Sequence, residues 1–245
     1  MLLKSAARIN LIFVYEWRKM ASADIVQIAA FDLDGTILDG ESPLKLTTSL
    51  FRHRELPIHT ALHMGIWGLC YRLRLPQTES TPRELLFSAL TEQSVEETDA
   101  EILKIYERRM RKCIRSAAVE EIERCRAAGM KLILASASFK PITTAIVDEL
   151  KFDGHVSTIM EEKDNHYTGN VLGVPVQGRE KLRLLVQYCD DRYGWKKWNL
   201  ARAYSDHFSD EPMLSMADEA FTVDPDNKLK RIAKRSGWKV LDWDD

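Results

Sequence analysis

Carboxylates, a hydroxyl and an amine occur at four separate places in the sequence, each shortly after an apolar run or a glycine. One carboxylate of such a set can attack phosphorus, and a second can protonate a leaving alkoxide and later activate water. Because a phosphate dianion repels a carboxylate nucleophile, cations must neutralise both groups. A lysine and Mg²⁺, which binds carboxylates, phosphate oxygens and water, would serve. The side chains concerned are Asp32, Asp34, Ser136, Lys181, Asp206 and Asp210.

The chemical types of these residues allow each of them a different role. Asp32 and Asp206 can supply carboxylates to the metal, and Lys181 can add a second positive charge. Ser136 and main-chain amides can hold the remaining phosphate oxygens. If the backbone after the first strand is extended, the spacing of Asp32 and Asp34 directs both carboxylates to the same side. Gly35 then allows a sharp turn beside the ligand.

The elements that must position these residues alternate between strand and helix. β-Branched and apolar runs predict strands at residues 25–33, 131–135, 156–160, 200–205, 219–223 and 238–241, with part of a hairpin near residues 167–169. Helical patterns cover residues 117–128, 141–150, 180–188 and 226–235. This alternation predicts an α/β fold, a Rossmann-like, mostly parallel sheet with helices on both faces. Ligands of such sheets bind beyond the carboxyl ends of the strands, where the polar residues fall.

Residues 41–115 have a different character and predict an inserted helical cap domain. They contain few β-branched runs and two capping boxes, which begin at Thr81 and Ser94. Apolar residues within the second of these helices fall on one predicted face. They are Ile102, Leu103, Tyr106, Met110 and Cys113. The catalytic core then comprises residues 23–40 and 116–245.

Residues 1–22 form an N-terminal extension with two interpretations. The start codon is assigned too far upstream of Met20, or the segment is an amphipathic helix that lies on a membrane or on the core. No run reaches the roughly 20 apolar residues of a membrane span. The apolar stretch at residues 62–71 is more readily a buried cap helix than a membrane contact, so peripheral membrane association is not favoured.

The overall composition is that of an ordinary globular protein. The chain has 245 residues, of which 45% are hydrophobic and 29% charged. A net charge of -2 gives no basic field for a nucleic-acid partner. The four cysteines are scattered without a C-x-x-C pair, which favours a cytoplasmic location and no structural zinc.

These motifs resemble those of the haloacid dehalogenase superfamily of hydrolases. Its signature Asp-x-Asp-x-Thr follows an apolar strand, and here it reads Asp32-Leu33-Asp34-Gly35-Thr36. The second motif, a Ser or Thr that ends a strand, matches Ser136. The third, a Lys before a helix, matches Lys181. The fourth, an acidic pair after a strand, matches Asp206 and Asp210. All four occur in order over about 180 residues, which makes the ordered set far more specific than any one motif.

The resemblance implies a role for each residue. Asp32 would be the nucleophile that becomes aspartyl-phosphate, and Asp34 the general acid and base, with its main-chain carbonyl on Mg²⁺. Asp206 would be the remaining metal ligand, whereas Thr36 and Asp210 would have supporting roles. The expected enzyme is therefore a magnesium-dependent phosphomonoester hydrolase.

The position of the insertion also resembles that of the cap in one branch of the superfamily, the phosphoserine-phosphatase-like branch or subfamily IB. Ser136 lies 102 residues after Asp34, but Lys181 only 45 after Ser136, so the cap lies in the first gap. Glu41 falls where phosphoserine phosphatases carry a Glu that contacts the substrate amine. Ala137 is a second candidate substrate contact, although Ser136-Ala137-Ser138 replaces the usual Ser-Gly-Gly.

Other functions use the same residues. A phosphotransferase or mutase would pass the phosphoryl group to another alcohol, and a lipid phosphatase would act on a phosphatidylglycerophosphate-like substrate. A non-catalytic binding protein on the same fold is the most distant alternative. His207, next to Asp206, is expected to be a bystander.

Overall fold

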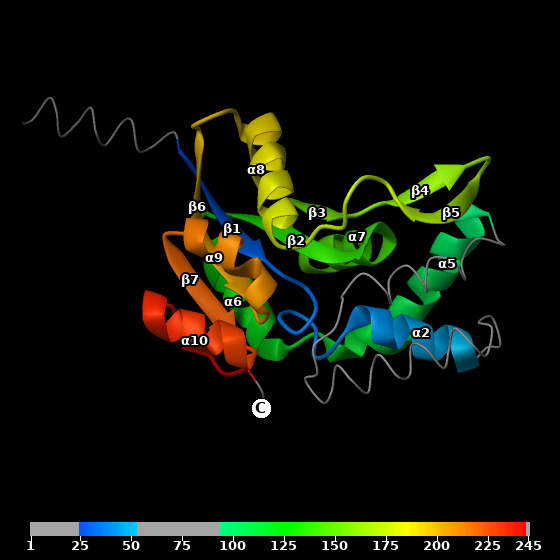
Figure 1. The fold of residues 1–245 in the computed structure, drawn as a ribbon, viewed down its shortest axis with the longest axis horizontal. Coiled ribbons are helices and arrows are strands. Elements are labelled where there is room, and N and C mark those ends of the chain that lie inside the picture. The colour runs from blue at the N-terminus through cyan, green and yellow to red at the C-terminus, as the bar shows by residue number, and fades with distance from the viewer. Residues whose placement is uncertain (1–24, 53–93, 244–245) are drawn as a thin grey trace, which may run out of the picture.

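The computed structural model describes residues 25–52 and 94–243. The N-terminal extension, the apolar stretch at residues 62–71 and the capping box at Thr81 lie outside this part of the chain. The centre is a six-stranded parallel sheet of order β3-β2-β1-β6-β7-β8 (Figure 1). The strands are β1 (Val26–Phe31), β2 (Lys131–Phe139), β3 (Gly154–Thr158), β6 (Trp198–Ser205), β7 (Glu219–Val223) and β8 (Lys239–Leu241).

Helices cover both faces of the sheet, as predicted, because both faces of its strands are apolar. Ile28 and Ala30 of β1 pack with Leu185 on one side, whereas Ala29 and Phe31 pack with Ile122 on the other. Figure 1 shows α8 and α9 on one side and α6 on the other. The helices that contact strands of the sheet are α6 (Ser116–Ala127), α7 (Lys140–Leu150), α8 (Arg179–Tyr193), α9 (Glu211–Met216) and α10 (Asn227–Ser236).

A helical insertion separates β1 from β2. Its described elements are α2 (Ser42–Arg52), α5 (Val95–Ile105), a π-helical turn η1 (Tyr106–Met110) and a 3-10 turn η2 (Arg111–Cys113). The two ends of the insertion meet: Asp39 donates its N–H to the Cys113 carbonyl at 2.8 Å, and Arg115 donates to the Ile37 carbonyl at 3.0 Å. The chain thus leaves and re-enters the sheet domain at one point.

A β-hairpin outside the main sheet contacts this insertion. Strands β4 (Met160–Lys163) and β5 (His166–Val171) form the hairpin, which lies beside α5 in Figure 1. Val95 donates its N–H to the Asn165 carbonyl at 2.9 Å, and Tyr167 donates its hydroxyl to Asp99 at 2.7 Å. The predicted capping box at Ser94 is confirmed, with both reciprocal hydrogen bonds to Glu97 present.

Several predicted boundaries differ from the structure. β2 continues beyond residue 135 to Phe139, because Ser136 and Phe139 still pair with β3. The strand predicted at residues 156–160 is two elements: β3 ends at Thr158, and Met160 begins β4. Leu103 does not share the buried face predicted for it. Its side chain is 40% exposed, and the helix changes to a π turn directly after residue 105.

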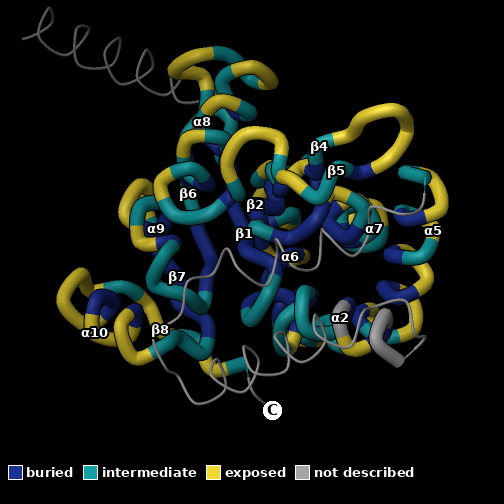
Figure 2. The backbone as a smooth tube through the Cα atoms, turned by 45° about the vertical axis from the view of Figure 1, so that its right-hand side comes forward, coloured by how far each residue is buried: buried dark blue, intermediate teal, exposed yellow. Residues whose placement is uncertain are grey.

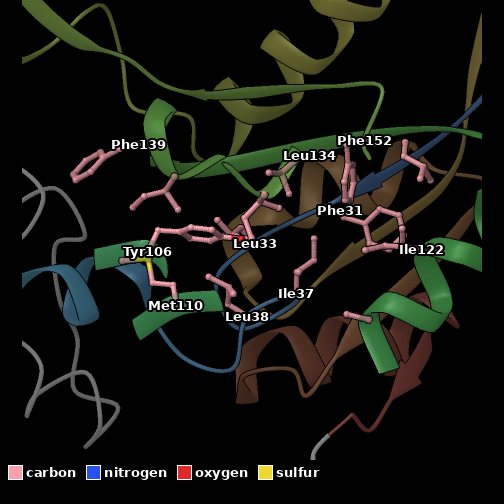
Figure 3. Close-up of a cluster of buried hydrophobic side chains, with 14 of the residues drawn as sticks. Phe31, Leu33, Ile37, Leu38, Tyr106, Met110, Ile122, Leu134, Phe139 and Phe152 are labelled. Atoms are coloured by element: carbon pink, nitrogen blue, oxygen red, sulfur yellow. The ribbon is translucent and has the colours of Figure 1, made fainter. Parts of the chain in front are cut away.

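The aspartate-bearing loop is anchored in an apolar cluster that joins sheet and insertion. Figure 2 shows the strands at the centre as the most buried part of the fold. In Figure 3, Leu33 lies between Leu134 of β2 and Tyr106 and Met110 of the insertion, and all four side chains belong to the buried cluster. Because Leu33 separates the two aspartates of the first motif, its burial fixes their backbone.

Strand β6 is held by the packing and hydrogen bonding of one tyrosine. The Tyr204 ring stacks between Phe31 and Phe221, at centroid distances of 4.2 and 4.6 Å. Its hydroxyl donates to the Glu121 carboxylate of α6 at 2.6 Å in the buried interior. This contact ties α6 to the strand that leads into the fourth motif.

We expect Tyr204→Phe to lower the free energy of unfolding by about 1–3 kcal/mol, the range for losing a hydrogen bond to a buried charged group. Urea denaturation measures this change. Tyr188→Phe is a matched control, because the Tyr188 hydroxyl makes only an exposed 3.3 Å hydrogen bond to a main-chain carbonyl. Equal losses in the two variants would contradict the importance of the Tyr204–Glu121 contact.

Candidate active site

Asp32 lies directly beyond the end of β1, at the carboxyl edge of the sheet. Its N–H donates to the Tyr204 carbonyl at 2.9 Å, so the sheet pairing continues up to this residue. The side chain is only 7% exposed, and its Oδ1 accepts a hydrogen bond from Lys181 Nζ at 2.9 Å. Burial raises the pKa of the Asp32 carboxyl to about 7, although Lys181 opposes this rise.

Lys181 joins two carboxylates from different parts of the chain. It lies in the first turn of α8, just after Gly178, and its side chain is 3% exposed. Besides Asp32, its ammonium donates to Oδ2 of Asp210, which also accepts from the Ser205 hydroxyl at 2.8 Å. Burial alone lowers the pKa of Lys181, but Asp210 and Asp32 outweigh it, so that the pKa is raised and the lysine stays charged.

Asp206 follows β6 and lies against the loop of the first motif. Its Oδ1 accepts a hydrogen bond from the Thr36 hydroxyl at 3.3 Å. Gly35 has a φ of +72°, and a Cβ at that position would lie 2.2 Å from Oδ2 of Asp206. Only glycine therefore lets the two loops approach this closely. Burial raises the pKa of the Asp206 carboxyl well above its ordinary value, and the charges of Asp32 and Glu41 raise it further.

The backbone between the two aspartates of the first motif is not extended, contrary to our expectation. Leu33 and Gly35 lie in turns, and Leu38 donates its N–H back to the Leu33 carbonyl at 2.9 Å. The two carboxylates consequently contact different partners. Whereas Asp32 faces Lys181, both oxygens of Asp34 accept hydrogen bonds from Ser42, at 2.6 Å from its N–H and 2.8 Å from its hydroxyl.

The second motif lies on the last part of β2. Ser136 is 1% exposed, and its Oγ accepts a hydrogen bond from the Ser138 N–H at 3.0 Å. The Ser138 hydroxyl in turn lies 2.7 Å from that of Ser42. Ala137, between them, is half-buried. These contacts link β2 to the start of α2 and, through it, to Asp34.

Glu41 and His207 lie near the site but in different settings. The charge of Glu41 contributes to the raised pKa of Asp206, after burial and Asp32, so its carboxylate lies within electrostatic reach of these acids. The His207 ring lies 2.9 Å from the Ser209 hydroxyl and 3.8 Å from Asp226. It therefore contacts the loop after β6 and the start of α10.

The local structure removes three simpler interpretations of these residues. Ser136 does not cap the next helix, because Phe139 occupies that position. Asp210 does occupy the cap position of α9, yet its side chain makes no capping hydrogen bond and instead binds Lys181. Lys181 is not a solvated helix lysine, since it is buried.

Sequence reasoning missed Ser42. Ser138 and Ser205 lie within the second and fourth motifs, but sequence reasoning gave neither of them a role. Nothing in the sequence near Ser42 indicates its contact with Asp34, because the turn through Gly40, at a φ of +84°, brings the two together. Serine side chains are short, so only the tertiary structure shows which of them face polar partners.

The charge balance of the site suits a divalent cation. Lys181 is surrounded by the carboxylates of Asp32 and Asp210, and the nearby Asp206 has no comparable ammonium partner in the described residues. Oδ1 of Asp210 is buried with no hydrogen-bond partner among those residues. The same part of the chain holds no group of three or more His, Cys, Asp or Glu side chains arranged for a metal. The ligand set that the family resemblance implies, two carboxylates and one main-chain carbonyl, contains fewer acidic side chains than such a group.

None of the helices in residues 25–52 and 94–243 combines the length and the apolar character that crossing a bilayer would need.

Comparison with known proteins gives consistent matches. The family model described as haloacid dehalogenase-like hydrolase matches residues 29–215, which include all four motifs. Phosphoserine phosphatase SerB1 of Mycobacterium tuberculosis is 26% identical over 230 residues, which cover 90% of this chain and 72% of that protein.

Solved structures show the same fold. A Bordetella pertussis protein of unknown function is similar with a TM-score of 0.79 and 25% identity, over 89% of this chain and 99% of that one. A phospho-aspartyl intermediate analogue of a phosphoserine phosphatase is similar with a TM-score of 0.61 and 18% identity, over 84% and 90% of the two chains. The second likeness, at this identity, concerns the fold alone.

The raised pKa of Asp206 predicts that this carboxyl destabilises the metal-free protein as the pH rises. A carboxyl with a folded-state pKa above its unfolded value binds more protons in the folded state, so its ionisation lowers the free energy of unfolding. Asp206→Asn removes this effect. In EDTA, we expect the variant to match the wild type at about pH 4 and to become increasingly more stable than the wild type towards about pH 8. Urea denaturation across this range measures the difference, and a difference independent of pH would contradict the explanation.

Proposed function

Because the chain belongs to the haloacid dehalogenase-like hydrolase family, in its phosphoserine-phosphatase-like branch, we propose that it hydrolyses a phosphate monoester through an aspartyl-phosphate on Asp32. The observation that carries this proposal is the buried contact of Lys181 with Asp32 and Asp210, beside Asp206 at the same edge of the sheet. This arrangement brings a nucleophile, a fixed positive charge and more carboxylates than ammonium groups to one place.

Asp32 and Asp206, with the main-chain carbonyl of Asp34, would hold Mg²⁺. When bound, the metal supplies positive charge that offsets the repulsion between the phosphate dianion and Asp32. Two observations support this assignment. Oδ1 of Asp210 is buried without a hydrogen-bond partner among the described residues. Burial raises the pKa values of Asp32 and Asp206, and neighbouring carboxylates raise them further.

The positions of the side chains support the following proposed reaction. A carboxylate oxygen of Asp32 attacks phosphorus, the bond to the leaving oxygen breaks, and Asp34 gives that oxygen its proton. Asp34 then takes a proton from water, which attacks phosphorus and breaks the bond to Asp32. Throughout, the Lys181 ammonium and the Ser136 hydroxyl stabilise the phosphoryl oxygens. Asp210 and Ser205 hold Lys181 in place.

We further propose that residues 41–115 act as a cap over this site, with residues 23–40 and 116–245 as the catalytic core. The contact of Asp39 with Cys113, and of Ile37 with Arg115, supports this division, because the insertion is joined to the core there. Ser42, the first residue of α2, then connects the cap to Asp34. Such a cap would exclude water while the phosphoryl group is transferred.

The substrate that we favour carries an amine. Glu41 lies within electrostatic reach of Asp206, and a carboxylate at this place would attract a cationic group of the substrate. The relative from Mycobacterium tuberculosis is named for phosphoserine, which has an amine next to its phosphate ester. Ala137 would face the same substrate from β2. A small amino-alcohol phosphate fits this charge arrangement better than a lipid-linked ester.

Asp32→Asn should reduce Mg²⁺-dependent turnover of para-nitrophenyl phosphate by about three orders of magnitude or more, because an amide cannot form the covalent intermediate. Release of nitrophenolate measures the rate. Asp164→Asn, in the exposed turn of the β4–β5 hairpin, is the matched control and should leave the rate unchanged. Turnover that survives Asp32→Asn would overturn the assignment of the nucleophile.

Glu41→Gln should raise the KM for O-phosphoserine by roughly 10–100-fold, the equivalent of one lost charge-assisted hydrogen bond. It should change the KM for glycerol phosphate, which has no amine, by much less. The ratio of the two effects isolates recognition of the amine from any change at Asp206. Glu107→Gln, at an exposed position of the π turn, is the control. An equal change for both esters would contradict the role of Glu41.

A further inference from the structure

A short chain of hydroxyl groups connects Asp34 with the second motif. The Ser42 N–H donates to Oδ1 of Asp34 at 2.6 Å, and the Ser42 hydroxyl lies 2.8 Å from Oδ2. The same hydroxyl lies 2.7 Å from that of Ser138, whose N–H donates to Ser136. Ser42 is fully buried and Ser138 is 3% exposed, so solvent does not compete for these contacts.

Counting protons fixes the direction of the chain when Asp34 is ionised. A carboxylate only accepts, so the single hydroxyl proton of Ser42 must go to Asp34. The Ser42 oxygen must then accept from Ser138. When Asp34 carries a proton on Oδ2, both hydroxyls can rotate, and the chain runs the other way. The network thus remains satisfied in both protonation states of Asp34.

The two contacts from Ser42 also fix the plane of the carboxyl group. One lone pair on each oxygen is engaged by the same residue, so that rotation about the Cβ–Cγ bond would break both hydrogen bonds. A carboxylate oxygen has two lone pairs, so one hydrogen bond from Ser42 does not by itself prevent proton transfer at that oxygen. Asp34 is therefore held in one orientation, as a group that transfers a proton to a defined atom requires.

We propose that Ser42, supported by Ser138, is a positioning residue that orients Asp34 for proton transfer to the leaving oxygen. This inference rests on the proposed function, in which Asp34 is the general acid. Ser42 opens α2 and Ser138 lies on β2, so the orientation of Asp34 depends on the docking of the insertion against the sheet.

The way in which the rate depends on the basicity of the leaving group distinguishes a positioning role of Ser42 from a merely structural one. Dinitrophenyl, nitrophenyl and phenyl phosphate release phenolates of increasing basicity, and only the more basic ones need protonation as they leave. For each ester, kcat/KM reports the steps up to departure of the leaving group. We expect Ser42→Ala to lower kcat/KM by roughly 100-fold on phenyl phosphate, but by less than about threefold on dinitrophenyl phosphate.

Three further variants sharpen the test. Ser42→Thr keeps the hydroxyl and should restore kcat/KM on phenyl phosphate to within a few fold of the wild type. Ser138→Ala should reproduce the dependence on leaving group in weaker form, and it also serves if Ser42→Ala does not fold. Ser49→Ala, at another buried serine of α2, is the matched control and should not alter the dependence.

A double-mutant cycle with Asp34→Asn completes the experiment. If Ser42 acts through Asp34, the double variant should be no slower than Asp34→Asn alone. Equal losses on all three esters, unchanged rates in Ser42→Ala, or additive losses in the cycle would overturn the role of Ser42. Asp32→Asn, assayed on dinitrophenyl phosphate, tests the proposed function separately from the role of Ser42. Retained activity in this variant would refute the proposed function itself.

Discussion

The buried contact of Lys181 with Asp32 and Asp210 is the interaction on which the rest of the site depends. Its partners lie 149 and 29 residues away in the sequence. They come together because β1 and β6 end, and α8 begins, at one edge of the sheet. Transfer of these charges from water is costly, and their mutual attraction only offsets that cost. The raised pKa values of Asp32 and Asp206 are the evidence of this cost. In the function we propose, a bound cation would offset it.

Apolar packing around the site stabilises the fold and offsets the cost of burying these charged groups. Leu33 holds the first-motif loop within the same buried cluster that contains Tyr106 and Met110 of the insertion. The Tyr204 ring and its contact with Glu121 brace β6, from which Asp206 projects. At Gly35, by contrast, a side chain would push the two loops apart. Strained and charged elements at functional sites are commonly supported in this way by the surrounding core.

The helical insertion contacts the rest of the protein at more places than the point where the chain enters and leaves it. Ser42 of α2 binds Asp34 and Ser138, and the β4–β5 hairpin is fastened to α5 through Val95 and Tyr167. The sheet domain thus contacts the insertion on two sides. In the proposed mechanism, this arrangement makes the geometry of proton transfer dependent on how the insertion docks.

The sequence by itself determined the family, the parallel α/β fold and most of the strands and helices along the chain, because apolar periodicity and short motifs are local properties. It did not show that residues 156–160 belong to two strands. It also indicated which aspartates, serine and lysine to examine. Only the tertiary structure decided what each side chain contacts: that Asp34 binds Ser42, that Asp210 holds Lys181 rather than capping α9, and that Ser138 belongs to the same network as Ser42. These contacts depend on turns at Leu33 and Gly40 and on the meeting of distant strand ends, which no local pattern encodes.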